Sequence, residues 1–398
     1  MHHTAPLEHL ALPFFGPEHR DMAPALATWA TEQLVDETDD RAACRTWVRT
    51  LGEAGWLRYC VPGAWGGALP KLDSRALVLA REALAFHSPL ADFAFAMQGL
   101  GSGAITLAGS PDQQQRWLPP VAQGHAIAAF ALSEPEAGSD VGAMQTTATP
   151  EAGGWRLDGI KTWISNGDLA DVYITFAKTD PTAGTRGISA FVVPAGQTGL
   201  DSSKHIELMA PHPLASLVFQ GCQLPGSALL GPLNGGFKLA MRTLDIFRAS
   251  VAGAALGMGR RALAEAVAHA QKRPLFGQRL ADFQLTQARL GEMAALLDAA
   301  ALLTYRAAWL RDTHPVGHAL PPAYTAAAAM AKMTATENAQ KVIDMALQMH
   351  GGLGVQVGQK IESLYRDIRA LRIYEGATEV QLLILGRHVL QSTGSPQT

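Results

Sequence analysis

One acidic residue of the chain, Glu375, has sequence neighbours that suit a catalytic base. Glu375 stands between an aromatic residue, Tyr374, and a glycine, Gly376, just after the charged run RDIR at 366–369 and just before a new helical pattern. At a turn of this kind the side chain can project into a cleft instead of into water. The alternative is an ordinary acidic residue at the start of a helix, where its charge suits the helix dipole. We take Glu375 as the candidate general base.

Two segments in the middle of the chain combine hydroxyl groups, glycines and aromatic side chains. The run FALSEPEAGSD at 130–140 leads into a Gly/Ser turn that can present donors to a flat heteroaromatic edge or to phosphate oxygens. From its chemistry alone an ordinary polar loop is favoured over a binding turn, at roughly two to one. The run KTWISNG at 161–167 ends in Asn-Gly, which is typical of a hairpin. Its tryptophan either fills the core or packs against a bound ring, and the sequence favours neither.

Polar residues also lie near the ends of the long helical patterns. Arg273, with Phe276 beside it, occupies a corner between two helices, where an arginine is usually solvated but can pair with a pyrophosphate. The run QMHGGLG at 348–354 is either a glycine helix cap or a place where the backbone approaches a ligand closely. Asp245 and Arg248, three apart on one helical face, more often form a surface pair than a site. No second ligand lies at metal spacing from the histidine of QMHGG, so we expect no metal site.

The elements that position these residues follow from the apolar periodicity. Helical spacing dominates 18–125, short β-rich runs separated by Gly, Pro and Asp dominate 126–235, and helical spacing returns over 236–271, 283–312, 322–350 and 377–392. The sequence therefore predicts an α+β fold that is mostly α. It would have a helical N-terminal domain (1–125), a middle antiparallel β domain (126–235) and a C-terminal four-helix bundle domain (236–398). Clustered strands argue against a doubly wound parallel sheet.

Composition excludes several classes of function. The 398 residues carry a net charge of −3 and are 48% hydrophobic, which indicates a large core and no basic field for nucleic acid or anionic lipid. Three cysteines without CxxC spacing are expected to be buried, reduced thiols in a cytoplasmic protein. No signal peptide and no membrane span are expected either.

The motifs, in this order and at these separations, resemble the acyl-CoA dehydrogenase family across essentially the whole chain. The resemblance is carried by LSEPEAGSD at 132–140, KTWISNG at 161–167, QMHGGLG at 348–354 and IYEG at 373–376. It implies the three-domain fold described above and a homotetramer of paired dimers. It also implies an FAD cofactor, an acyl-CoA substrate, and electron-transfer flavoprotein as the electron acceptor, in the breakdown of fatty acids or other acyl-CoA compounds.

The resemblance also implies which residues contact the ligands. The residues implied for FAD are Phe130, Leu132, Ser133, Gly138, Ser139, Trp163, Ile164, Ser165, Ala377 and Glu379. Six more, Arg273, Phe276, Gln284, Gln348, Gly351 and Gly352, would reach the FAD of a partner subunit. Those implied for the substrate are Ser139, Asp245, Arg248, Tyr374 and Gly376.

In such proteins the catalytic glutamate takes the α proton of the thioester while a β hydride passes to the flavin, which gives a trans-2-enoyl thioester. Here the matching residue is Glu375. Some members supply the base from the position just before the arginine of the Asp245 helix, but that position is Phe247, which cannot accept a proton. Glu375 gains weight by this elimination.

Three departures from the family pattern bear on the substrate. Ala377 replaces a usual threonine, Leu275 stands where Thr or Gln is common, and the loop 209–215 lacks a usual Gly-x-Arg pattern. The alternatives are dehydrogenation of an acyl group on a carrier protein and a flavin oxidase or monooxygenase on the same scaffold. A helical scaffold without cofactor is rated at roughly one in twenty, because the base and the flavin-contacting residues occur together.

Overall fold

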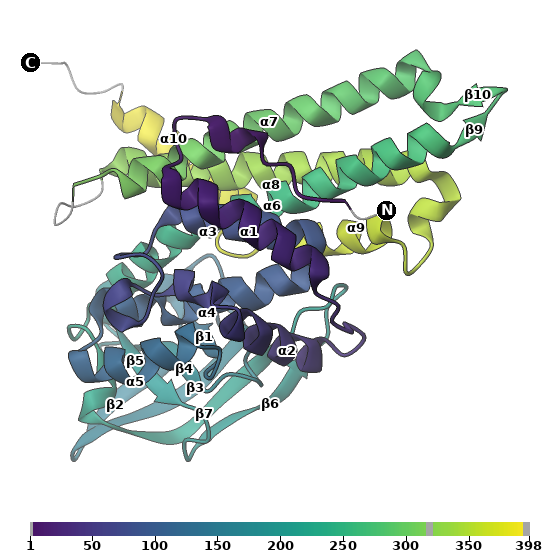
Figure 1. Ribbon diagram of the computed structural model, residues 1–398. Helices are drawn as coiled ribbons and strands as arrows, with labels where there is room; N and C mark the ends of the chain where they lie inside the picture. The colour runs from purple at the N-terminus through teal and green to yellow at the C-terminus, as the bar shows by residue number, and fades with distance from the viewer. Residues whose placement is uncertain (1–2, 316–320, 393–398) are drawn as a thin grey trace, which may run out of the picture. The chain divides into compact units, whose positions relative to one another are not determined.

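The computed structural model describes residues 3–315 and 321–392 (Figure 1). They form two compact units. The first consists of the described residues within Met1–Leu34, Asp73–Asp92 and Asp245–Thr398, and the second comprises Val35–Leu72 and Phe93–Leu244. Two helices, α4 (Pro89–Ala108) and α6 (Gly236–Lys272), run from one unit into the other. The domain boundaries expected from the sequence stay predictions.

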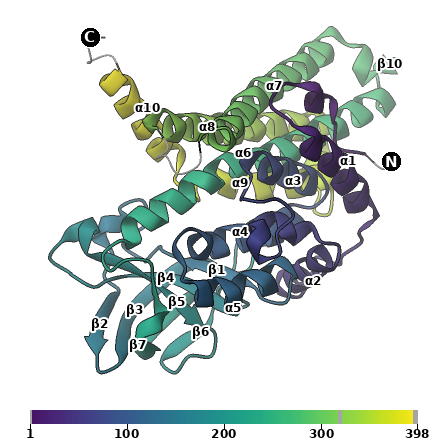
Figure 2. The ribbon, with the colours of Figure 1, turned by 60° about the vertical axis from the view of Figure 1, so that its left-hand side comes forward.

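The first unit is helical. Its helices are α1 (Pro17–Glu32), α3 (Ser74–His87), most of α6, α7 (Gln284–Asp312), α8 (Pro322–His350), α9 (Lys360–Leu371) and α10 (Thr378–Ser392). The Asp73 carboxylate caps α3 by accepting from the backbone N–H of Ala76 at 2.9 Å. Small residues let the helices approach closely: a methyl group on Gly257 of α6 would lie 2.2 Å from the backbone oxygen of Glu82 in α3. Both views show α7 and α8 side by side (Figures 1 and 2).

The four long helices expected from the sequence are confirmed as α6, α7, α8 and α10, with ends within one residue of the prediction. The sequence missed α9 and a small hairpin of β9 (Pro274–Leu275) and β10 (Gln278–Arg279) at the far end of α6. One helix among the described residues, α7, is long and apolar enough to cross a membrane. A core helix of a bundle passes the same test, so this is weak support for a span.

The second unit is built on an eight-stranded sheet with the order β6-β7-β3-β2-β4-β5-β8, and β1 pairs with β4. The strands are β1 (Ala128–Ala131), β2 (Thr147–Glu151), β3 (Gly154–Ser165), β4 (Val172–Lys178), β5 (Ile188–Pro194), β6 (Leu200–Ile206), β7 (Leu214–Pro225) and β8 (Leu229–Leu230). The other main helices of this unit are α2 (Asp40–Glu53) and α5 (Pro111–Ala122). Figure 2 shows β2, β3 and β7 as neighbouring arrows.

One expectation about the sheet is mostly confirmed and another is wrong. Most strand pairs are antiparallel, as expected, but β1 and β2 both run parallel to β4. Asn166-Gly167 is not a hairpin turn between paired strands, because β3 pairs with β2 and β7 and not with β4. Asn166 instead ends β3 in a left-handed conformation (φ 57°), and its N–H donates to the carbonyl of Pro213.

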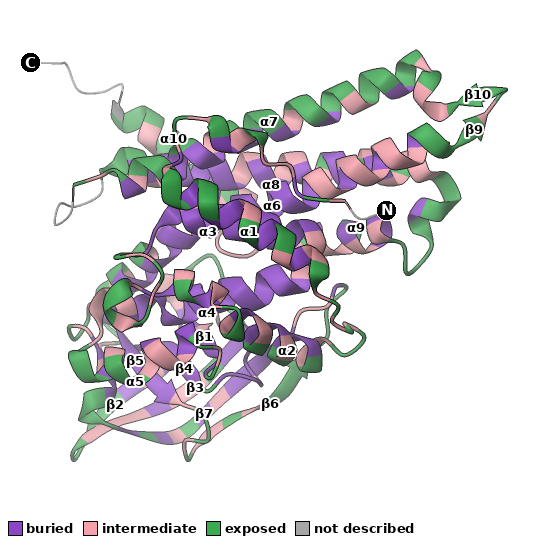
Figure 3. Ribbon diagram, viewed as in Figure 1, coloured by how far each residue is buried: buried purple, intermediate pink, exposed green. Residues whose placement is uncertain are grey.

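Short 3-10 turns connect these elements at Glu8–Ala11, Trp56–Cys60, Gly63–Trp65, Val141–Ala143, Gly184–Gly187, Gly226–Ala228, Leu280–Asp282 and Gly351–Val355. Buried residues fill the interior of each unit (Figure 3). The expectation that the thiols are buried is confirmed for Cys44, Cys60 and Cys222, and none of the three forms a disulfide.

Candidate active site

Glu375 lies in the short connection between α9 and α10, in the first unit. Its backbone is left-handed (φ 52°), which is uncommon for a residue with a side chain, and Gly376 follows with φ 93°. The residue as a whole is half-buried, but both carboxylate oxygens are buried and neither has a hydrogen-bond partner among the described residues. The alternative of a solvated charge at a helix start is therefore wrong.

Burial raises the pKa of Glu375, since a buried carboxylate loses its hydration. The positive charges of Arg81, Lys332 and Arg248 act in the opposite direction, and the negative charge of Asp92 adds to the rise. The Glu375 carboxylate is therefore shielded from solvent, has no hydrogen-bond partner among the described residues, and is acted on mainly by positive charges. Such a group is a stronger base than an exposed carboxylate and has lone pairs ready to accept a proton.

Arg81 is a buried cation with fixed partners, and sequence reasoning missed it. Its guanidinium donates from Nε and Nη2 to the two oxygens of Asp92, at 2.8 and 2.9 Å, and from Nη1 to the hydroxyl of Ser250 at 3.1 Å. The Tyr374 hydroxyl interacts with the same guanidinium, and burial raises the pKa of Tyr374. The available signal was that three charged residues, Arg81, Glu82 and Asp92, stand in a mostly apolar stretch.

Asp245 and Arg248 also lie near Glu375. Arg248 is buried and forms an ion pair with Asp245, and its Nε is 3.4 Å from the carbonyl oxygen of Glu375. Two α8 residues hold Asp245: the Tyr324 hydroxyl donates to its carbonyl at 2.7 Å, and the Thr325 hydroxyl donates to its carboxylate at 3.1 Å. The surface-pair interpretation of Asp245 and Arg248 is therefore wrong.

Trp163, in the second unit, does not fill the core. Its side chain is 57% exposed and its backbone is left-handed (φ 58°), within a register shift of the β3–β7 pairing between Lys161 and Ile164. The backbone N–H of Thr162 donates to the carbonyl of Ser133 at 3.0 Å, so the two segments expected to contact the flavin ring are joined. An exposed large aromatic ring, on a segment that is joined to Ser133 and continues into Ser165, fits a planar heteroaromatic ligand.

A buried ion pair connects the same two segments. The Lys161 ammonium is 2.8 Å from the Glu134 carboxylate and donates to the carbonyl of Leu132 at 3.0 Å. Glu134 also accepts from the backbone N–H groups of Gln145 and Thr146. Burial lowers the pKa of Lys161 to about 8, while Glu134 acts to raise it. Sequence reasoning did not single out this pair, although both residues lie inside its motifs.

The remaining candidates are distributed as follows. In the second unit Phe130, Ser133 and Ser165 are half-buried, Gly138 and Ser139 are exposed, and Leu132 and Ile164 are buried. In the first unit Arg273, Phe276, Gln284, Gln348, Gly351, Gly352 and Glu379 are exposed, while Ala377 is half-buried. Phe276, at the tip of the β9–β10 hairpin, is 90% exposed in a left-handed conformation. Gly351 caps α8, as one of the two interpretations of the glycine run expected.

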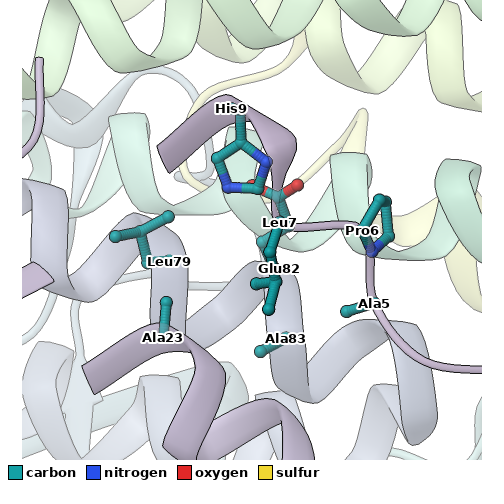
Figure 4. A pocket seen from close by; sticks show the side chains of 8 residues that line it. All are labelled: Ala5, Pro6, Leu7, His9, Ala23, Leu79, Glu82 and Ala83. Atoms are coloured by element: carbon teal, nitrogen blue, oxygen red, sulfur yellow. The ribbon is translucent and has the colours of Figure 1, made fainter. Parts of the chain in front are cut away.

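Within the described part of the chain, no group of three or more His, Cys, Asp or Glu residues has the geometry to hold a metal ion. A small pocket in the first unit has mostly apolar walls, with the His9 ring and the Glu82 carboxylate as its polar parts (Figure 4). None of the candidate site residues lines it, so it is not part of the site around Glu375.

Comparison with known proteins decides the family. Three models match in order along the chain: the N-terminal domain of acyl-CoA dehydrogenase over residues 16–125, its middle domain over 129–222 and its C-terminal domain over 234–390. The chain belongs to the acyl-CoA dehydrogenase family. It is therefore an oxidoreductase acting on acyl-CoA, and its fold is the acyl-CoA dehydrogenase fold.

Three similar proteins cover nearly the whole chain. The 3-(aryl)acrylate reductase of Clostridium sporogenes is 36% identical over 95% of this chain and 100% of its own length. The human mitochondrial short-chain specific acyl-CoA dehydrogenase is 38% identical over 87% of this chain and 82% of its own. The structure of butyryl-CoA dehydrogenase from Megasphaera elsdenii superposes with a TM-score of 0.87, at 31% identity, over 94% of this chain and 99% of that one.

Two more relatives bear on the cofactor and the partner. An acyl-CoA dehydrogenase from Bacillus anthracis, solved in complex with FAD, is 29% identical, with a TM-score of 0.87 over 95% of this chain and 68% of that one. The caffeyl-CoA reductase-Etf complex subunit CarC of Acetobacterium woodii is 34% identical over 91% of this chain and 94% of its own length. The cofactor of this family is FAD.

Proposed function

We propose that the chain removes hydrogen from the α,β bond of an acyl-CoA thioester to give a trans-2-enoyl-CoA, with Glu375 as the base that takes the α proton. The single observation that carries the proposal is the Glu375 carboxylate, with both oxygens buried and without hydrogen-bond partners among the described residues. FAD, when bound, supplies the acceptor for the β hydride.

Different residues of the chain would bind the cofactor and transfer the proton. In the second unit, Ser133, Trp163 and Ser165 would hold the flavin ring, since Trp163 offers an exposed face and the two serines offer hydroxyl donors. The exposed Arg273 and Phe276 would reach the FAD of a partner subunit, where the guanidinium of Arg273 can pair with the pyrophosphate. Glu375 then accepts the α proton on a carboxylate oxygen. The cations near Glu375 keep it ionised before the transfer.

Electron-transfer flavoprotein is our proposed electron acceptor, because one relative is a subunit of a complex with such a protein. We also propose that the chain forms the homotetramer of paired dimers implied by its family. Light scattering of the purified protein tests the assembly. Slow reoxidation of the reduced flavin by oxygen, with fast transfer to electron-transfer flavoprotein, would exclude the oxidase and monooxygenase alternatives.

One relative gives a second candidate for the physiological direction. The 3-(aryl)acrylate reductase is named for the reverse reaction, reduction of a double bond next to a carboxyl group. Glu375 would then donate its proton instead of accepting one. A panel of saturated and 3-aryl-acrylyl thioesters, scored by bleaching or recovery of the flavin absorbance, distinguishes the two directions.

The variant Glu375→Gln tests the base. It is expected to remain folded and yellow and to lose flavin bleaching by saturated acyl-CoA thioesters, because an amide cannot accept the α proton. Asp344→Asn, which removes an exposed carboxylate on α8, is the matched control and is expected to keep normal activity. Near-normal bleaching by Glu375→Gln would overturn the assignment.

A further inference from the structure

The turn that carries Glu375 has an unfavourable backbone that must be held from outside. Glu375 and Gly376 are both left-handed, and Gly376 tolerates this because it has no Cβ. Glu375 has no such freedom, and the surrounding structure has to keep it there. The contacts that do so show which residues control the direction of its carboxylate.

Two side chains of α8 hold this turn. One oxygen of Glu337 accepts from Nε of Arg372 at 2.8 Å and from the hydroxyl of Thr378 at 2.7 Å, so it joins the residues before and after the turn. The Lys332 ammonium donates to the carbonyl of Gly376 at 2.8 Å, inside the turn. The Gln381 amide of α10 donates to the same carbonyl at 2.9 Å.

Unlike the two arginines near Glu375, Lys332 forms no ion pair with a carboxylate among the described residues. Arg81 is paired with Asp92, and Arg248 is paired with Asp245, so much of the charge of each arginine is neutralised. Lys332 is fully buried, and within the described part of the chain no carboxylate oxygen lies within the 4.0 Å ion-pair distance of its ammonium. Its ammonium donates instead to a neutral acceptor, the carbonyl of Gly376.

The charged groups that act on Lys332 come from four elements. Burial lowers the pKa of Lys332 to about 8, and the strongest opposing charge is that of Glu375. Glu337 and Glu379 act in the same direction as Glu375, and Arg248 acts against them. Lys332 and Glu375 are therefore two buried charges of opposite sign, each without a direct ion pair among the described residues.

We propose that Lys332 is a positioning residue of the reaction, which holds the Glu375 turn through the Gly376 carbonyl and supplies the positive charge that keeps the buried carboxylate ionised. The inference rests on the proposed role of Glu375 as the base. It adds a residue of α8 that acts through Glu375 and does not touch the substrate.

The first test measures the ionisation of Glu375 without turnover. Difference infrared spectra recorded across a pH titration show a protonated-carboxyl band, and the part of it that disappears in Glu375→Gln belongs to Glu375. In Lys332→Met this band is expected to appear at a pH higher by about one unit, because an opposite charge nearby has been removed. Lys341→Met, which removes an exposed cation of the same helix, is the control and is expected to leave the band in place. An unshifted band in Lys332→Met would overturn the proposal.

The same shift is expected in the kinetics. On the acid side of the pH profile, the flavin-bleaching rate of Lys332→Met is expected to fall at a pH about one unit higher than in the wild type. At a pH well below both transitions its rate is then about tenfold lower than that of the wild type. If Glu375→Gln kept its activity, the assignment of Glu375 as the base would be wrong. The infrared result would still show whether Lys332 affects the ionisation of Glu375. The two failures are thus distinguishable.

If Lys332→Met folds poorly, its denaturation midpoint provides a separate test of the proposal. If its instability arises from an uncompensated Glu375 charge, the double variant Lys332→Met/Glu375→Gln regains most of the lost denaturation midpoint. If Lys332 has only a structural role, the double variant is as unstable as the single one, and the proposal is wrong.

Discussion

The buried ion pair of Arg81 and Asp92 allows a quantitative prediction about the stability of the protein. Asp92→Asn keeps the shape of the side chain but removes its charge and turns one acceptor oxygen into a donor that faces the guanidinium. Both oxygens of Asp92 now accept from Arg81, and the exposed fraction of each side chain is 3% or less. Arg81 would be left as a buried cation without its ion-pair partner.

Removing one partner of a buried pair costs about 3–5 kcal/mol, because the remaining charge stays desolvated. With a urea dependence of about 3 kcal/mol per M for a unit of this size, the unfolding midpoint falls by about 1 M or more. Urea unfolding followed by tryptophan fluorescence measures the shift.

The chain provides a matched control in the exposed pair of Arg289 and Glu292, whose side chains are 53% and 49% exposed. Glu292→Gln removes this pair and is expected to cost less than about 1 kcal/mol, because water screens it. If Asp92→Asn and Glu292→Gln lowered the midpoint equally, the reasoning about the buried pair would be refuted.

Asp92→Asn also acts on the candidate base. The negative charge of Asp92 raises the pKa of Glu375, so its removal lowers that pKa. The acid limb of the flavin-bleaching rate is then expected to move to lower pH, opposite to the shift expected for Lys332→Met. A shift of the same sign in both variants would contradict the electrostatic account of the site.

The helices were predictable because their apolar periodicity is strong over long stretches. The elements that the sequence missed are short: α9 has 12 residues, and β9 and β10 have two residues each. A two-residue strand is too short to show a period, whereas the apolar residues of α9, Ile361, Leu364, Ile368 and Leu371, recur at helical spacing and were overlooked. The turn at Glu375 was predictable from its glycine, but its left-handed backbone was not.

The surroundings of Glu375 could not be predicted from local patterns. Arg81, Arg248 and Lys332 lie between 43 and 294 positions away along the chain, as their numbers show, and only the packing of α3, α6 and α8 brings them together. The orientation of Trp163 was undecided for a related reason. Side chains alternate between the faces of a strand, and the register shift between Lys161 and Ile164 interrupts that alternation, which no hydrophobic pattern records.

Two further predictions concern groups outside the immediate surroundings of Glu375. Lys161→Met leaves the Glu134 carboxylate buried without its cation, so we expect a loss of about 3–5 kcal/mol in stability and weaker FAD retention. Lys204→Met, at an exposed position of β6, is the control, and equal retention of the yellow colour in both would contradict the role of the pair. His87 predicts a pH dependence: burial lowers its pKa from 6.5 to about 4, and its Nε2 is buried without a partner among the described residues. Between these values the unfolded chain binds a proton that the folded chain does not, so stability is full above about pH 6.5 and is lost as the pH falls toward 4. His87→Leu removes this difference, and its urea midpoints should therefore fall less steeply than those of the wild type over that interval. Parallel midpoint curves for the two proteins would show that His87 is not the group responsible.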